Sequence, residues 1–251
     1  MSGQRWNRRD FLQAAAGSAG ALILGGCAGR GRSFGETSSG VTGPVPKDDW
    51  ASLGQLALSR VKRSGCEYGD IRLLETRNQS VRAEDGRISN IGDRYDCGYG
   101  IRALYQGAWG FAASADFTPA EIERTAQRAV EIARASHTLM KTPVKLADEP
   151  VHRDTVKTAF QVDPFTVSFE DKCALLLGVS EVLHKDKGII RSSGSIWAQR
   201  DIKHFASTEG SAIDFDLLAI GGGFSATAKG DGDFQSRDYS LPYRRAGYEH
   251  I

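Results

Sequence analysis

Hydrophobic and polar positions alternate in two short runs near the middle of the chain. Residues 98–105 and 108–114 both show the period of two that is typical of half-buried strands. Gln106 and Gly107 separate the two runs, and glycine supplies the positive φ that a two-residue hairpin turn needs. This pattern predicts a β-hairpin over residues 98–114.

A helix with a complete start signal follows this hairpin. Thr118 is placed as the N-cap, Pro119 fits the first helical position and Glu121 completes a capping box. Phe117 and Ile122 are spaced to form a hydrophobic staple. The apolar positions of the helix fall on one face: Ile122, Ala126, Ala129, Val130 and Ala133.

The same periods predict the remaining elements. Helices are expected from Asp48 or Asp49 to about Ser64, and over about 169–185 after the N-cap Ser168. Asp85-Gly86 predicts a second hairpin turn, between strands at 80–84 and 87–91. Further strands are expected at 71–73, 151–160, 189–199, 202–207, 211–220 and 224–228, with Glu209-Gly210 as the turn before Ser211.

This order of elements predicts an α+β fold. Hairpins dominate and no βαβ alternation occurs, so the sheets are expected to be antiparallel and hairpin-rich, with helices packed on one face. Two lobes are expected, at 48–136 and 151–251, joined by a proline-containing connection over 137–150. The last residues do not look like a closing element, so the second lobe is expected to be truncated at its C-terminal end.

Residues 1–27 look like a targeting leader rather than part of the fold. Arg8 and Arg9 precede Phe11, Leu12 and a short, weakly apolar run, an order that resembles a twin-arginine export signal. A chance arginine pair before an N-terminal amphipathic helix is the alternative. The leader predicts export by the twin-arginine route.

Cys27 ends a Leu-Gly-Gly-Cys sequence that resembles a lipobox, in which the cysteine is acylated. Ordinary cleavage at nearby small residues is the alternative. Residues 28–47 are rich in Gly, Ser and Thr and predict a flexible tether. The protein is therefore expected to be periplasmic or a membrane-anchored lipoprotein, with a lipid anchor as its only contact with the membrane.

The net charge of +1 across 251 residues argues against nucleic acid as a partner. Cys66, Cys97 and Cys173 are an odd number at wide spacing, which argues against a disulfide framework, although a single bridge stays open. Small buried thiols are the favoured interpretation for all three.

Three segments together resemble the N-terminal region of the TldD/PmbA family of metalloproteases: residues 80–88, 98–135 and 205–211. The run Gly-Ala-Trp-Gly-Phe-Ala at 107–112, before the capped helix, is the most specific of them. The resemblance implies a peptide-hydrolysing protein built as a homo- or heterodimer of two-lobed subunits. It also implies zinc, held in TldD-type members by an HExxxH motif and a further ligand in the C-terminal half.

None of the five histidines fits that motif, because no His is followed by Glu. No catalytic or metal-binding residue is therefore assigned to this chain, and zinc is expected in a C-terminal half that it lacks. The chain alone is predicted to be inactive, whereas the full-length protein is expected to hydrolyse peptides. One alternative is a non-catalytic PmbA-type partner or assembly subunit. Another is an unrelated exported α+β domain that binds a small ligand.

Two aromatic residues remain as candidates for a substrate groove. Trp109 and Phe111 could line a peptide groove, although their alternation favours packing in the core. The Gly-Asp-rich run at 229–233 is better read as a hairpin turn than as a calcium loop. Ser207 and Ser211 have no evident His-Asp partners, so a serine hydrolase is unsupported.

Overall fold

The computed structural model describes residues 49–230 and 232–251. The predicted leader and tether, including Arg8, Arg9 and Cys27, lie outside these residues. The described part forms one seven-stranded sheet and three α-helices. The strands are β1 (Tyr68–Glu84), β2 (Arg87–Tyr105), β3 (Ala108–Ser114), β4 (Arg153–Lys157), β5 (Ile189–Ser207), β6 (Ala212–Lys229) and β7 (Phe234–Arg244). The helices are α2 (Trp50–Arg63), α3 (Pro119–Leu139) and α4 (Phe169–Leu183), and a 3₁₀ turn, η2 (Tyr248–His250), lies near the last residue.

The sheet order is β3-β2-β1-β5-β6-β4, with β7 also paired to β6. All pairings are antiparallel except that of β4 with β6. The α+β class and its antiparallel hairpins are therefore confirmed. The strand β7 was not predicted from the sequence, because its run of polar and exposed residues has no clear alternation.

The two hairpin turns have the predicted conformation. Asp85 and Gly86 have φ of 48° and 74°, and Gln106 and Gly107 have φ of 46° and 79°. Positive φ at both central residues matches the right-handed twist of the flanking strands, and only glycine takes it without strain at the second position.

The helix start at Thr118 forms as predicted except for one bond. The Thr118 hydroxyl accepts from the Glu121 N–H at 3.4 Å, while the Thr118 N–H donates to Asp116 Oδ1 at 2.9 Å. Asp116 therefore takes the place that the Glu121 side chain has in a full capping box, and Glu121 pairs with Arg124 instead. Phe117 is buried in the same core as the helix, as a hydrophobic staple requires.

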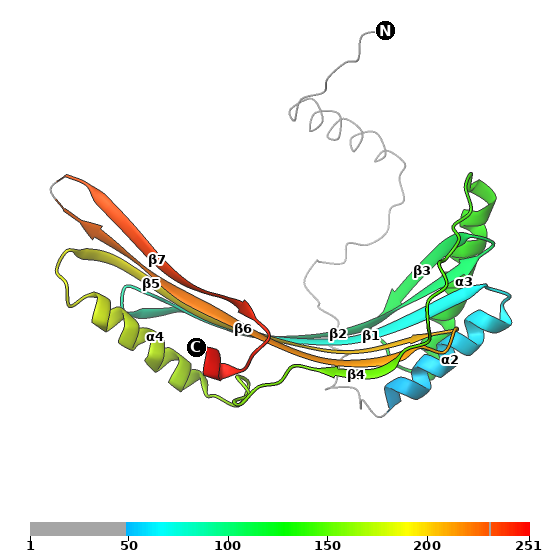
Figure 1. Ribbon diagram of the computed structural model, residues 1–251, viewed down its shortest axis with the longest axis horizontal. Helices are drawn as coiled ribbons and strands as arrows, with labels where there is room; N and C mark the ends of the chain where they lie inside the picture. The colour runs from blue at the N-terminus through cyan, green and yellow to red at the C-terminus, as the bar shows by residue number, and fades with distance from the viewer. Residues whose placement is uncertain (1–48, 231) are drawn as a thin grey trace, which may run out of the picture. The chain divides into compact units, whose positions relative to one another are not determined.

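All three helices cover the same face of the sheet, at opposite ends of the strands (Figure 1). The larger core lies under α2 and α3 and includes Ile71 and Leu73 of β1. The smaller core lies under α4 and includes Val81 and Ala83 of the same strand. Odd-numbered residues of β1 thus face the helix side of the sheet along its whole length, which follows from the alternation of a strand.

The two predicted lobes share this sheet. β1, from the first lobe, pairs with β5, from the second, over Asp70–Glu84 and Ser193–Ser207. A long-range pairing of this kind has no local signal in the sequence. The connection at 137–150 separates two segments of the chain, but both segments contribute strands to the same sheet. None of the helices in the described residues has the length and apolar composition that crossing a bilayer requires.

Candidate functional site

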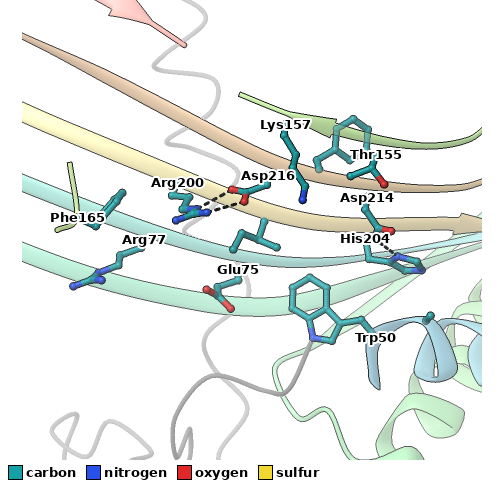
Figure 2. Close-up of a pocket in the computed structure, with 13 residues that line it drawn as sticks. Trp50, Glu75, Arg77, Thr155, Lys157, Phe165, Arg200, His204, Asp214 and Asp216 are labelled. Atoms are coloured by element: carbon teal, nitrogen blue, oxygen red, sulfur yellow. Dashed lines mark hydrogen bonds and ion pairs between the residues drawn. The ribbon is translucent and has the colours of Figure 1, made fainter. Parts of the chain in front are cut away.

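A polar groove lies on the helix side of the sheet, between the start of α2 and the loop before α4 (Figure 2). We call it the helix-side groove. It has a volume of about 610 Å³ and crosses strands β1, β5, β6 and β4. Its lining includes Trp50, Glu75, Arg77, Lys157, Phe165, Arg200, His204, Asp214 and Asp216. Neither α2 nor α4 covers this part of the sheet. Charged side chains therefore occupy the kind of strand position that apolar residues occupy under the two helices.

An arginine clamped by two carboxylates forms the centre of the groove. Arg200 binds Asp216 through two parallel bonds, from Nε and from one terminal nitrogen, each of 2.7 Å. Its other terminal nitrogen donates to Asp163 Oδ2 at 3.0 Å. The bonds with Asp216 raise the pKa of Arg200, which therefore stays charged. Two acidic partners hold this guanidinium in one orientation, so it is a fixed part of the floor.

A histidine–aspartate pair lies next to it, towards α2. His204 Nδ1 lies 2.6 Å from Asp214 Oδ1, and these residues face each other across β5 and β6. The imidazole is buried whereas the carboxylate is exposed. A Cβ placed on Gly54 of α2 would contact His204 Nε2 at 3.6 Å, so the ring lies directly under that helix. The pair thus supports α2 as well as lining the groove.

The β1 and β2 side of the groove holds a second set of charges. Arg77 binds Asp93 of β2 in a two-pronged contact of 3.1 and 2.6 Å, which lowers the pKa of Asp93. Burial raises the pKa of Tyr95, and the Glu75 carboxylate opposes its ionisation further. Glu75 therefore interacts with the Tyr95 phenol and also lines the groove.

The groove offers fixed donors and acceptors along its length, and rings at its two ends. Glu75 and Asp214 are acceptors, Lys157 and Arg77 are donors, and Trp50 and Phe165 are the rings at opposite ends. Such a mixture suits an extended chain with alternating polar groups better than a single small anion. The described residues contain no group of three His, Cys, Asp or Glu side chains arranged to hold a metal ion.

Trp109 and Phe111 lie on the opposite, helix-free side of the sheet. Phe111 is 57% exposed and lines a second cavity of about 520 Å³, while Trp109 is partly buried. The expectation that they pack in the core is wrong, because the small residues that alternate with them, Ala108, Gly110 and Ala112, are buried on the α3 side instead. Gly110 is the closest of these: any Cβ there would overlap the backbone of α3.

Cationic side chains cover much of this helix-free side. Arg102 binds the fully buried Asp70 with its Nε 2.9 Å from Oδ2, and its guanidinium lies 4.8 Å from the centre of the Trp109 ring. Lys203 lies over Phe215 in the same way, at 5.4 Å. Arginine and lysine stems thus shield rings that would otherwise be exposed.

The remaining residues considered from the sequence are not brought together. Ser207 is buried with its hydroxyl unpaired among the described residues, and Ser211 caps the loop by accepting from the His152 N–H. The described part of the 229–233 run forms the turn between β6 and β7. Cys66, Cys97 and Cys173 are free and half-buried.

The groove residues were not predicted from the sequence. The length of the loop between β5 and β6 could have identified two of them, His204 and Asp214. The Ser207 N–H donates to the Ser211 carbonyl, so Thr208–Gly210 form a three-residue loop between β5 and β6, with Gly210 at a φ of 101°. This three-residue loop pairs His204 with Asp214. A two-residue turn at Glu209-Gly210, as predicted, would shift the register by one residue and pair His204 with Phe215 instead.

Comparison with known proteins shows that residues 69–133 are similar to the family described as PmbA/TldA metallopeptidase domain 1. A metalloprotease of Methanocaldococcus jannaschii is 26% identical over 171 residues, which are 67% of this chain and 37% of that protein. A metalloprotease of Methanothermobacter thermautotrophicus is 24% identical over 59% of this chain and 31% of its own length. The chain therefore spans about a third of these curated relatives.

Solved structures share the fold at low identity. A proposed modulator of DNA gyrase from Bacteroides thetaiotaomicron has a TM-score of 0.64 and 18% identity, over 80% of this chain and 46% of that one. A similarly described protein of Thermotoga maritima gives 0.60 and 17%, over 80% and 44%. TldE of Thermococcus kodakarensis gives 0.54 and 14%, over 75% and 42%.

Proposed function

We propose that this chain is the N-terminal part of an exported zinc metallopeptidase, because residues 69–133 match the model described as PmbA/TldA metallopeptidase domain 1. The match to that domain is the observation that carries the proposal. Two relatives that bear the name metalloprotease, and that match over most of this chain, support it. Both relatives are longer, which leaves room for a catalytic half beyond the matched region.

The residues of this chain do not fit the zinc site that the family implies. The sequence lacks HExxxH, and the described residues hold no suitable cluster of ligands. A bound zinc would supply an activated water for peptide hydrolysis. This part of the protein would instead bind and orient the substrate.

The helix-side groove is the place we propose for the peptide. Glu75 and Asp214 would accept from its backbone amides or basic side chains, and Lys157 would donate to its carbonyl groups. Arg200 is already held by two carboxylates and would shape the floor rather than pair with substrate.

Two experiments test this function. Sequencing the gene downstream of the codon for Ile251 should reveal HExxxH in the same reading frame, and an open frame without it would refute the proposed catalytic role. The longer protein should then cleave an unfolded polypeptide with zinc and lose activity when a chelator removes the metal.

The groove has its own kinetic test in that protein. Glu75→Gln should raise KM by about three- to tenfold with little change in kcat, because the lost hydrogen bond acts equally on bound substrate and transition state. Glu123→Gln, on the exposed face of α3, is the matched control and should behave as the wild type. A Glu75→Gln enzyme with wild-type KM would place the peptide elsewhere.

Export and anchoring are further parts of the proposal. Arg8 and Arg9 would direct the folded protein through the twin-arginine route, and Cys27 would carry the lipid. Replacing both arginines by lysine should leave the protein in the cytoplasm, whereas Cys27→Ser should release it from the membrane fraction without blocking export. A protein that reaches the periplasm without the arginine pair would contradict this targeting.

A non-catalytic partner subunit is the second candidate function, favoured by the lack of any HExxxH motif in these residues. In that case the protein would join a TldD-type subunit in a heterodimer, rather than pair with itself. An in-frame continuation without the motif would support this role.

A further inference from the structure

The face of the sheet opposite α4 is polar where β1, β5, β6 and β7 form it (Figure 1). In β5, Ile196 is buried towards α4, whereas Ser193, Ser195 and Trp197 alternate with the buried residues and point to the other side. A cavity of about 440 Å³ lies on this side, and we call it the serine–tryptophan pocket. The side chains that line it include Arg82, Glu84, Ser193, Ser195, Trp197 and Asp238.

Strand pairing places the lining residues in two neighbouring rows across the sheet. The first row is Arg82, Ser195 and Gly223, and the second is Glu84, Ser193, Ser225 and Asp238. The hydroxyl groups of Ser193 and Ser225 bond to each other at 2.9 Å. Because serine side chains are short, the middle of the rows is low, and the longer charged side chains of β1 and β7 border it.

The charged side chains of the pocket can bind a ligand. Arg82 and Glu84 are exposed, and neither side chain has an ion pair or a hydrogen bond with another residue that the structure describes. On the opposite border, Asp238 accepts a long bond of 3.5 Å from the Ser240 hydroxyl. Arg87 of β2 pairs with Glu84 and extends the second row, so the two rows carry two positive and two negative charges. The pocket thus offers donors and acceptors without an excess of either charge.

Two stacked rings form the end of the pocket towards the middle of the sheet. The Trp197 ring lies over Gly221, where an added Cβ would fall 2.5 Å from a ring carbon. Tyr243 stacks on Trp197, with the ring centres 4.9 Å apart and an angle of 18° between the planes. Tyr243 is 56% exposed, so the ring face turned away from Trp197 is open to a ligand. Trp197 pairs with Ser80, two residues before Arg82, which places Arg82 roughly 7–8 Å from Trp197.

A sugar chain combines the two kinds of group that this pocket can bind. The C–H groups on one side of a sugar ring carry small positive charges and pack on the negative face of an aromatic ring. Adjacent hydroxyl groups match the paired nitrogens of a guanidinium and the paired oxygens of a carboxylate. An extended peptide fits less well, because it binds through the open edge of a sheet, and this pocket lies on a face. Nucleic acid needs an excess of positive charge, which the two rows lack.

We propose that the serine–tryptophan pocket binds a neutral oligosaccharide. One sugar ring stacks on Tyr243, and the hydroxyl groups of the next ring bond to Arg82 and Glu84. Among the described residues, the pocket shares no lining side chain with the helix-side groove, so it is a second site. The inference goes beyond the proposed function, because sugar binding requires neither zinc nor peptide hydrolysis.

An NMR titration of the full 251-residue chain tests this binding. The probes are cellotetraose, maltotetraose and the tetramer of N-acetylglucosamine, each at millimolar concentration. At least one of them should shift the Trp197 indole signal, which Trp197→Phe identifies, together with the amide signals of Ser193 and Ser195. If none of the three sugars shifts these signals, the proposal is overturned.

Variants of exposed residues locate the site. Tyr243→Ala should weaken binding about tenfold, because the stacking face is lost, whereas Tyr243→Phe keeps the ring and should stay within about twofold of the wild type. Arg82→Gln should weaken binding by about tenfold or more, because charged hydrogen bonds are lost. Arg128→Gln, on the exposed face of α3, is the matched control and should bind as the wild type does. Urea unfolding checks that each variant remains folded.

Two further outcomes would contradict the proposal. A sugar affinity that is unchanged in both Tyr243→Ala and Arg82→Gln would place the sugar elsewhere on the protein. An unfolded polypeptide that shifts the Trp197 signal when the sugars do not would show that the pocket takes peptides.

Discussion

The contact between α3 and β3 can be tested by adding a single methyl group. Gly110 of β3 lies against the backbone of α3, and a Cβ built on it would fall closer than 3.0 Å to Ala129 and Ala133 backbone atoms. Those atoms cannot rotate away as a side chain can. Gly110→Ala therefore requires the helix and the strand to separate by about 1 Å.

The cost follows from what this helix buries. Ile122, Ala126, Ala129, Val130 and Ala133 are all fully buried on the face of α3 that meets the sheet. A gap of 0.5–1 Å loses about a quarter to a half of each atomic contact. We expect Gly110→Ala to lower the free energy of unfolding by about 3 kcal/mol, which is at the upper end of overpacking effects.

Urea and thermal unfolding measure this loss directly. For a domain of this size, about 3 kcal/mol corresponds to a fall in Tm of about 6–12 °C. Gly54→Ala is the matched control, because its Cβ would meet its neighbours at ordinary contact distances of 3.6 Å and more. Since alanine favours a helix over glycine, this variant should gain about 0.5–1 kcal/mol. If Gly110→Ala stays within 1 kcal/mol of the wild type, the close packing of α3 on β3 is refuted.

Three further changes probe other contacts. Arg102→Met should cost about 2–3 kcal/mol in urea unfolding, because it leaves the buried Asp70 carboxylate without its main partner, and adding Asp70→Asn should recover part of the loss. Backbone N–H groups, first that of Val162, lower the pKa of Glu249 from 4.5 to about 2, so the C-terminal turn should be held above pH 4.5 and released as the pH falls towards 2. Amide exchange at Val162 should follow this release in the wild type and lose its pH dependence in Glu249→Gln. Phe111→Ala should change stability by less than about 0.5 kcal/mol, because that ring is mostly exposed, and a loss above 1.5 kcal/mol would mean that it is covered.

Local signals predicted the turns and the helix starts, which depend on neighbouring residues alone, but they divided β1, β2, β5 and β6 each into two shorter strands. The hairpin at Gln106-Gly107 and the N-cap at Thr118 both form where glycine and threonine chemistry favour them. The helices α2 and α4 also begin after Asp49 and Ser168 as predicted, although only Ser168 caps its helix with a side-chain hydrogen bond. The pairing of β1 with β5 joins residues more than a hundred positions apart, and no local pattern indicates it.

The buried faces of α4 and β6 do not follow from their apolar residues alone. Lys172 is buried in α4, where its ammonium donates to Gln79 Oε1 and to the carbonyl of Pro164, both at 2.7 Å. Burial lowers the pKa of this lysine, yet its two acceptors satisfy it. In β6 the apolar residues Ile213 and Phe215 lie on the helix-free side, and Asp214 and Asp216, which alternate with them, line the groove.

How closely a helix can approach the sheet explains both the side on which these apolar residues lie and the location of the groove. Alternation shows that a strand has two different faces, but the side that a helix covers depends on how closely the helix can approach. At β3 the helix takes the side with Gly110, because small residues allow backbone contact, and the larger Trp109 and Phe111 must then point away. Between α2 and α4 no helix approaches, so Asp214 and Asp216 can occupy the helix side with their charges paired and partly hydrated. The groove with its paired charges therefore forms where no helix covers the sheet. Its position depends on helix packing, which the hydrophobic pattern alone does not encode.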